Sequence, residues 1–218
     1  TVTSPNPHLT PICGRQWRIM VNYATDAPPE SITINGTAYP AKTDYRVWLQ
    51  VSDLLCNLDS ASDQDAITHN LNTVRTLETL VFGCVLNEPV LDVLNACAEF
   101  YRGYPAEGNG YHPETDSTTG EKLFSFKHDI NLILIAIRNQ SGIDLSYRRK
   151  EPYHWWLFLL EFRSLESRHH ICQVIGWRGY TGDDPKLLEI KRQYALPQEY
   201  TRDEQRAIDE MERIFYAT

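Results

Sequence analysis

The sequence has few cysteines, and none of them stands in a pattern that forms metal sites or disulfide frameworks. The count is odd, the spacings are irregular, and no C-x-x-C pair occurs. A disulfide framework or a zinc ribbon would show paired cysteines at short, regular spacings. We therefore expect reduced, mostly buried thiols in a cytoplasm. The cysteines are Cys13, Cys56, Cys84, Cys97 and Cys172.

The chain also lacks a long apolar run and an excess of positive charge. Its longest apolar stretch, 130–137, is interrupted by Asn131 and is too short to cross a bilayer. The formal net charge is −8, which disfavours binding to phosphate backbones and to anionic membranes. The hydrophobic fraction of 42% is that of a folded protein. We therefore predict a folded protein that binds neither nucleic acid nor membrane.

Two segments lack any periodicity, and they set the predicted domain organisation. Residues 1–19 follow neither a strand nor a helix pattern, so we predict an extended or disordered N-terminal arm. Residues 103–122 are rich in Gly, Pro, Thr and Glu and predict a long exposed loop, which is either functional or mobile. The remaining sequence, 20–218, is predicted to form a single helical domain around this loop.

A short β-hairpin is predicted at 31–42, near the start of that domain. Isoleucines there alternate with polar residues, and Asn35-Gly36 suits the positive φ angles of a tight type I′ turn. Pro40 cannot donate a ladder hydrogen bond, so its strand is expected at an edge.

Apolar residues at helical spacing follow the hairpin and predict helices for the rest of the chain. The cap signals are Asp44 in the first turn of the first helix, the residues 62–65 before the second, and Asn87 before the third. The helix at 126–140 is apolar nearly all round and is expected to be central. The predicted fold class is thus mainly α, a bundle-like multi-helix domain with a small N-terminal hairpin. The apolar stripes and helical segments are 47–55, 67–81, 90–101, 126–140, 151–165, 168–176, about 185–195 and 202–216, the last with Ile208, Met211 and Phe215 on one face.

Three histidines are candidates for chemistry. His169 and His170 are adjacent, and adjacent helical side chains point about 100° apart, so one metal ion could take both only from a loop. His154 lies in an apolar segment without a nucleophile, and Glu161, two turns on, is too far to orient it. Packing is the favoured reading of His154. We predict no catalytic, cofactor or metal site, and hence not an enzyme.

The basic run Arg148-Arg149-Lys150 is the only cluster that suggests phosphate contacts. It is flanked by Asp144 and Glu151, and no second basic cluster with interleaved aromatic residues supports it. We interpret the run as a solvated surface.

Several motifs follow one another from about residue 20 to the C-terminus. In their order and spacing they resemble the gene-product-fifteen family of tailed-bacteriophage proteins. Residues 1–19 have no counterpart in the family pattern, and the loop at 103–122 is longer than usual. The motifs are Gly36-x-x-Tyr39-Pro40 leading into Thr43-Asp44-Tyr45-Arg46-x-Trp48, then Phe100-Tyr101-Arg102-Gly103, Phe126, Gly142-Ile143-Asp144-Leu145, His154-Trp155-Trp156-x-Phe158 and Ile175-Gly176-Trp177-Arg178.

The resemblance implies a phage or prophage tail assembly chaperone. Such a protein would bind the tape-measure protein before the tail tube polymerises, with the tail-tube protein as a further candidate partner and the host bacterial cytoplasm as its location. The alternative is a structural tail or connector protein retained in the virion tail. A DNA-binding regulator is a third reading, which the net charge disfavours. The sequence leaves the oligomeric state open.

Candidate partner contacts come from the residue types that anchor protein interfaces. Aromatic side chains and arginines carry most of the binding energy in such interfaces. Trp48 also lies on an apolar stripe, which is typical of a core residue. The candidates are Tyr45, Arg46, Trp48, Tyr101 and Trp177.

Overall fold

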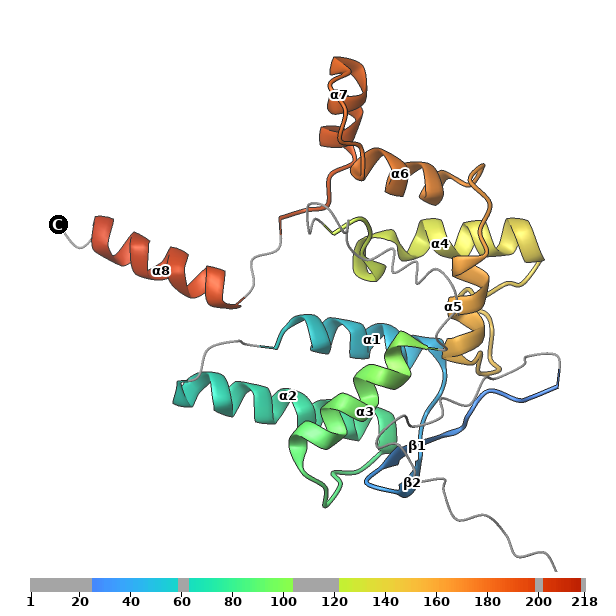
Figure 1. The fold of residues 1–218 in the computed structure, drawn as a ribbon, viewed down its shortest axis with the longest axis vertical. Helices are drawn as coiled ribbons and strands as arrows, with labels where there is room; N and C mark the ends of the chain where they lie inside the picture. Colours follow the sequence, from blue (N-terminus) through green and yellow to red (C-terminus); the bar gives the residue numbers. More distant parts are fainter. Residues whose placement is uncertain (1–24, 59–62, 104–121, 199–201, 217–218) are drawn as a thin grey trace, which may run out of the picture.

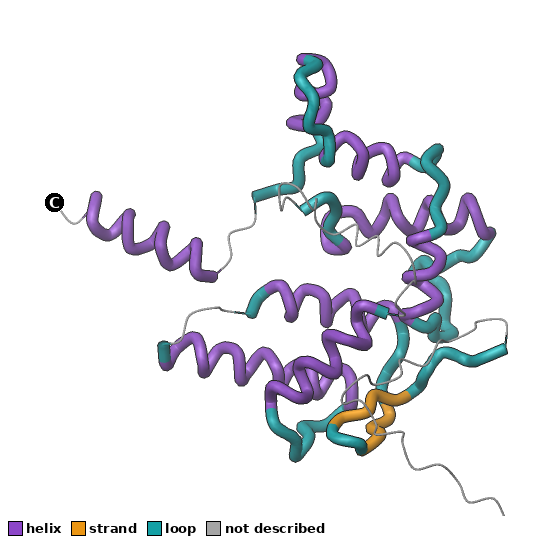
Figure 2. The backbone as a smooth tube through the Cα atoms, in the orientation of Figure 1, coloured by secondary structure: helices purple, strands orange, loops and turns teal. Residues whose placement is uncertain are grey.

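The computed structural model describes residues 25–58, 63–103, 122–198 and 202–216. The predictions for 1–19 and for almost all of the loop at 103–122 fall outside these residues. The described chain is mainly helical with one small sheet, so the predicted fold class is confirmed (Figures 1 and 2). Its elements are β1 (Ser31–Ile34), β2 (Thr37–Pro40), α1 (Tyr45–Cys56), α2 (Gln64–Phe82), α3 (Val90–Arg102), α4 (Phe126–Ser141), α5 (Trp155–Arg163), α6 (His170–Arg178), α7 (Pro185–Gln193) and α8 (Arg202–Tyr216).

The hairpin forms as its turn residues predict. Asn35 has φ 50° and Gly36 has φ 82°, which are the positive angles of a type I′ turn. The strands pair antiparallel, and the ladder ends where Ser31 meets Pro40. The paired residues end two residues before the predicted limit, although Ala41 N–H still donates to Glu30 O at 3.0 Å. β1 packs on α3, and the Asn35 side chain donates hydrogen bonds to carboxylates near the start of that helix.

α1, α2 and α3 pack together beside the hairpin (Figure 1). Asp44 and Asp63 cap α1 and α2, each accepting a hydrogen bond from a backbone N–H of the first turn. The predicted cap of α3 is wrong. That helix begins after Pro89, which is its N-cap and offers no side-chain hydrogen bond.

α5 begins at Trp155, whereas the sequence predicted a start near 151. The residues before it are extended, because they pair with the residues before α1. Tyr45 N–H donates to Tyr153 O at 2.8 Å, and Trp155 N–H donates to Thr43 O at 2.7 Å. His154, in this bridge, is the N-cap of α5. Two helices from distant parts of the sequence thus start side by side.

The core is built largely from aromatic side chains where α1, α3, α4 and α5 meet. Trp48 stacks on Phe100 with ring centroids 4.5 Å apart, and Trp155 stacks on Phe158 at 5.4 Å. α4 contacts α1, α5 and α6, so it is covered by neighbours on several sides, as predicted. Its Ile135 remains 49% exposed, because the three neighbouring helices leave one side of α4 open.

Candidate functional site

Two of the five predicted contact residues lie in the core. Tyr45 is 3% exposed and stacks on Phe158, and its hydroxyl donates to the Leu145 carbonyl. Trp48 is fully buried, and its indole N–H donates to Lys42 O at 2.9 Å. The sequence had offered both as partner contacts. Both side chains belong to the apolar stripe of α1, and in this conformation they offer no surface to a partner.

Arg46 is partly exposed but is held by contacts within the chain. Its guanidinium pairs with Asp44 at 2.7 Å and donates to Arg149 O at 3.1 Å. Burial acts to raise the pKa of Asp44, but hydrogen bonds from the Arg46 side chain and backbone and from Tyr153 N–H outweigh it and lower that pKa. Arg46 thus stabilises the start of α1 in the position where α5 also begins.

Trp177 lies on a separate surface formed by α6 and α7. It is half-buried, and its ring packs against Tyr194 at 4.9 Å and against His170 at 5.9 Å. This small aromatic cluster joins α7 to α6, which accounts for the packing of Trp177 without a partner.

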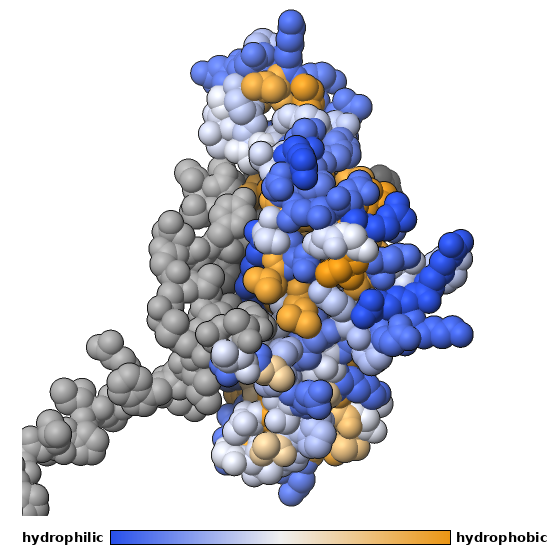
Figure 3. Space-filling model, turned by 90° about the vertical axis from the view of Figure 1, so that its right-hand side faces the viewer, coloured by the Kyte–Doolittle hydropathy of each residue, from blue (hydrophilic) through white to orange (hydrophobic). Residues whose placement is uncertain are grey.

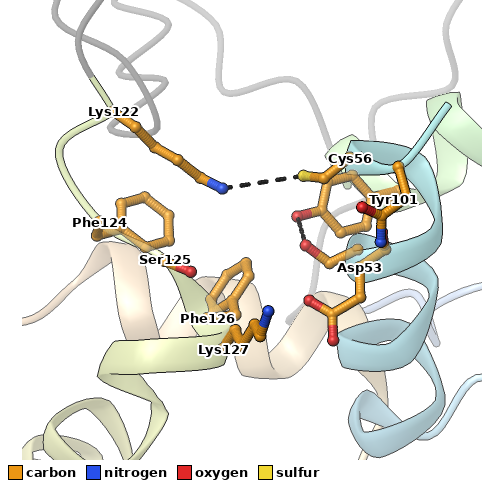
Figure 4. A pocket seen from close by; sticks show the side chains of 10 residues that line it. Asp53, Cys56, Tyr101, Lys122, Phe124, Ser125, Phe126 and Lys127 are labelled. Carbon is orange, nitrogen blue, oxygen red and sulfur yellow. Dashed lines mark hydrogen bonds between the residues drawn. The ribbon is translucent and has the colours of Figure 1, made fainter. Parts of the chain in front are cut away.

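Tyr101 lines a pocket, and it is the predicted contact residue that the structure places best for binding. The pocket has a volume of about 390 Å³ and lies between the C-terminal turn of α1, the end of α3 and the start of α4 (Figure 4). The Tyr101 hydroxyl is 2.8 Å from the Ser52 hydroxyl. Its ring stacks on Trp155 at 5.3 Å. The core therefore holds this wall of the pocket in place.

Aromatic rings and charged side chains form the rest of the pocket. Phe124 and Phe126 are buried, with edge-to-face centroids 5.0 Å apart, and both pack on Phe162 behind them. Lys122 and Lys127 extend from the same segment, and Lys122 Nζ lies 3.9 Å from Cys56 Sγ across the pocket (Figure 4). The walls of the pocket therefore combine aromatic rings with lysine side chains and with the carboxylate of Asp53 (Figure 4).

Sequence reasoning missed this segment because it lies between the long loop and the predicted helix. The run Lys122-Leu-Phe-Ser-Phe-Lys127 did carry a usable signal. Its two phenylalanines, Phe124 and Phe126, are separated by one residue, so in an extended segment both point to the same side. A lysine stands at each end of the run. Cys56 gave no signal of its own, since nothing in its sequence neighbourhood indicates a pocket.

The three histidines weighed for chemistry make structural contacts. His154 Nδ1 accepts the N–H of Trp156 at 3.0 Å and its Nε2 lies 2.9 Å from Pro29 O, so the tautomer with the proton on Nε2 satisfies both. His169 is buried, with Nε2 3.1 Å from the Gln140 side-chain oxygen. His170 is exposed and packs on aromatic rings. The adjacent pair thus does not converge on one point.

Among the described residues, no three His, Cys, Asp or Glu side chains gather closely enough to hold a metal ion. In the same residues, no helix is both long enough and apolar enough to span a membrane.

Exposed apolar side chains form only small patches on the face drawn in Figure 3. Hydrophilic residues separate these patches (Figure 3). Single exposed apolar residues such as Leu91 and Leu160 are normal on a protein surface. The pocket beside Tyr101 is therefore the stronger candidate site in the described chain.

Comparison with known proteins places the chain in a family. A family model described as Bacteriophage Gp15 protein matches residues 25–202, which is most of the chain. The resemblance inferred from the sequence motifs is thereby confirmed. No curated protein matches the chain. No solved structure matches it either.

Proposed function

Since the chain belongs to the Bacteriophage Gp15 protein family, we propose that it is a tail assembly chaperone that binds the tape-measure protein. In this role it acts in the host bacterial cytoplasm before the tail tube polymerises, and the tail-tube protein is a second candidate partner. The pocket beside Tyr101 is the observation on which we base the proposed contact.

The pocket has the features expected of an anchor site for a partner helix. Helix recognition commonly inserts large apolar side chains into a groove between helices. Here the anchor would rest on the rings of Tyr101, Phe124 and Phe126. These rings are supported by the aromatic core, so binding requires little rearrangement of this wall and loses less free energy to ordering. Lys122 at the rim favours a carboxylate on the partner next to the anchor.

A binding role also agrees with how the reactive residue types are used. His154 caps α5 and contacts Pro29, and His169 contacts Gln140. The Cys97 thiol is buried, and burial raises its pKa to about 12, far from the value that a nucleophilic thiolate needs. We therefore propose a protein without catalytic activity of its own.

Co-expression with the tape-measure protein encoded in the same phage genome tests the proposal. The full chain is expected to increase the soluble yield of the tape measure and to elute with it as a complex. Substitution Cys56→Trp fills the pocket from an exposed position and is expected to abolish both effects. Cys84→Trp places the same bulk on another exposed cysteine, outside the pocket, and should leave both effects unchanged.

Three outcomes contradict the proposal or part of it. Equal solubility of the tape measure with and without this chain would exclude a chaperone role. Stoichiometric recovery of the chain in purified virions would favour the structural tail or connector protein. Equal loss or equal retention of binding in the two tryptophan variants would show that the pocket is not the contact.

A further inference from the structure

α8 carries an amphipathic face on which Met211 is exposed and Ile208 is partly exposed. The helix lies beside the body formed by α1–α7 (Figure 1). Met211 is 54% exposed, although apolar residues recur on its side of the helix. The family match ends at residue 202, where α8 begins, so this surface is additional to the matched region.

The orientation of α8 is set by its basic side. Arg206 donates to Asp63, the cap of α2, at 3.1 Å. Arg206 and Ile208 lie about 200° apart around the helix axis, so the side that bears Ile208 points away from α2. Arg213, about two turns beyond Arg206, is on the same side as Arg206. The contact with α2 therefore uses the polar side and leaves the apolar face outward.

Acidic side chains border the outward face. Glu204 precedes Ile208 by one turn on the same side of α8. Asp209 lies next to Ile208 and accepts a hydrogen bond from Gln205 at 2.7 Å. Glu204, Gln205 and Asp209 are all exposed. Ile208 and Met211 thus share their side of α8 with the Glu204 carboxylate, Asp209 lies at the edge of this side, and the arginines lie on the opposite side.

From this distribution of charge we propose that α8 is a docking helix for an amphipathic helix of a partner protein, one with lysines or arginines flanking an apolar stripe. Complementary charge favours such a partner and steers its approach. A second copy of α8 fits less well, because pairing would bring the bordering carboxylates of both copies into one interface. Anionic lipid and nucleic acid are disfavoured by the same carboxylates.

A binding assay with designed peptides tests the proposal on the full chain. The probe is a fluorescent helical peptide of about 18 residues, five turns, with leucines on one face and flanking lysines. The control peptide has glutamates in place of the lysines. We expect the lysine peptide to bind at least about tenfold more tightly, a difference that shrinks as salt is added.

Three substitutions in α8 separate the effect of the docking face from the effect of net charge. Met211→Asp should weaken binding of the lysine peptide by about tenfold or more, since it puts a charge on the apolar face. Arg213→Ala changes the net charge by the same amount on the opposite side and should leave binding unchanged. Met211→Leu keeps the face apolar and should also bind normally.

Three outcomes would overturn this inference. Met211→Asp could bind the lysine peptide as tightly as the unmodified chain, which would place the contact elsewhere. Loss of binding in Cys56→Trp would place the peptide in the pocket instead of on α8. Sedimentation could reveal a dimer that Met211→Asp dissociates, which would make a second copy the occupant. These readouts do not depend on the tape measure, so they can fail or succeed separately from the proposed function.

Discussion

Arg178 and Asp129 form a buried, two-point ion pair that joins α6 to the first turn of α4. The guanidinium nitrogens lie 2.6 and 3.0 Å from the two carboxylate oxygens. Arg178 also donates to the carbonyl oxygens of Tyr194 and Leu123, and Asp129 accepts the Ser125 N–H. One pair of side chains thus fixes α6, the residue after α7 and the segment that forms one wall of the pocket.

We predict that breaking this pair from one side strongly destabilises the protein. Asp129→Leu or Arg178→Leu leaves one charge buried and unpaired, which typically costs about 3–5 kcal/mol. The double variant removes both charges and should be more stable than either single variant. Urea unfolding of the three variants measures these differences. Single variants as stable as the unmodified chain would show that the pair is not buried in solution.

We predict that Gly103 is far less tolerant of a side chain than Gly142. Both have positive φ, 72° and 73°. A Cβ at Gly103 would lie 2.7 Å from Leu159 Cδ1, whereas nothing lies within 4 Å of the corresponding position at Gly142. Gly142→Ala should therefore lower the free energy of unfolding by about 1 kcal/mol, through the strained backbone conformation alone.

Gly103→Ala adds the steric conflict with Leu159. Its ψ of −165° also lies in a region that only glycine adopts readily. We expect a cost of about 2–4 kcal/mol in total, again measured by urea unfolding. The two variants carry the same substitution at positions with nearly the same φ. Equal losses of unfolding free energy in the two would therefore contradict the close approach of α3 to α5.

The sequence predicted those features that depend on local pattern. The hairpin turn follows from Asn35-Gly36, whose positive φ angles need those residue types. The helical segments follow from composition and spacing, and the caps Asp44 and Asp63 lie within a residue or so of where the sequence placed the helix starts. Each depends only on neighbours along the chain, so periodicity was sufficient to find them.

The features that periodicity missed depend on contacts between distant segments. The start of α5 is set by pairing of Tyr153 and Trp155 with the residues before α1, which no local pattern contains. The burial of two of the partner-contact candidates, Tyr45 and Trp48, could not be predicted for a related reason. Aromatic residues are common both in interfaces and in cores, and only the packing of α1 against α5 decides that Trp48 is buried while Tyr101 reaches a pocket.

We predict that His154 makes stability fall as the pH falls below neutrality. Burial lowers the pKa of His154, against smaller opposing effects of the Pro29 carbonyl and Glu30. Below the ordinary value of about 6.5, the unfolded chain then binds a proton that the folded chain does not. The stabilising contribution of His154 is therefore complete above about pH 6.5 and is lost as the pH falls toward the lowered pKa.

The substitution His154→Asn tests this contribution. Asparagine keeps an acceptor that can cap α5 but does not titrate. Between pH 7 and pH 5.5 the free energy of unfolding should fall more in the unmodified chain than in His154→Asn. Identical pH profiles for the two proteins would show that His154 is not buried in its neutral form.

Glu78 should have the opposite effect to His154, because it makes stability fall as the pH rises. It is a buried carboxyl between α2 and α3, and burial raises its pKa, against the smaller effects of the Leu86 N–H and Arg75. A raised folded pKa means that the stabilising contribution is complete below the ordinary value of about 4.5 and is lost as the pH rises through the raised value. At pH 7 the ionised carboxylate is then a net cost to the folded state.

Glu78→Gln removes this cost and keeps an oxygen that can accept the Leu86 N–H. We expect the variant to be at least as stable as the unmodified chain at pH 7 and to lose that advantage at pH 4, as measured by urea unfolding. Glu99→Gln, which removes an exposed carboxylate from α3, is the control and should show little change at either pH. A Glu78→Gln variant that is clearly destabilised at pH 7 would show that the charge itself contributes to folding, through a contact stronger than the 3.4 Å hydrogen bond from Leu86.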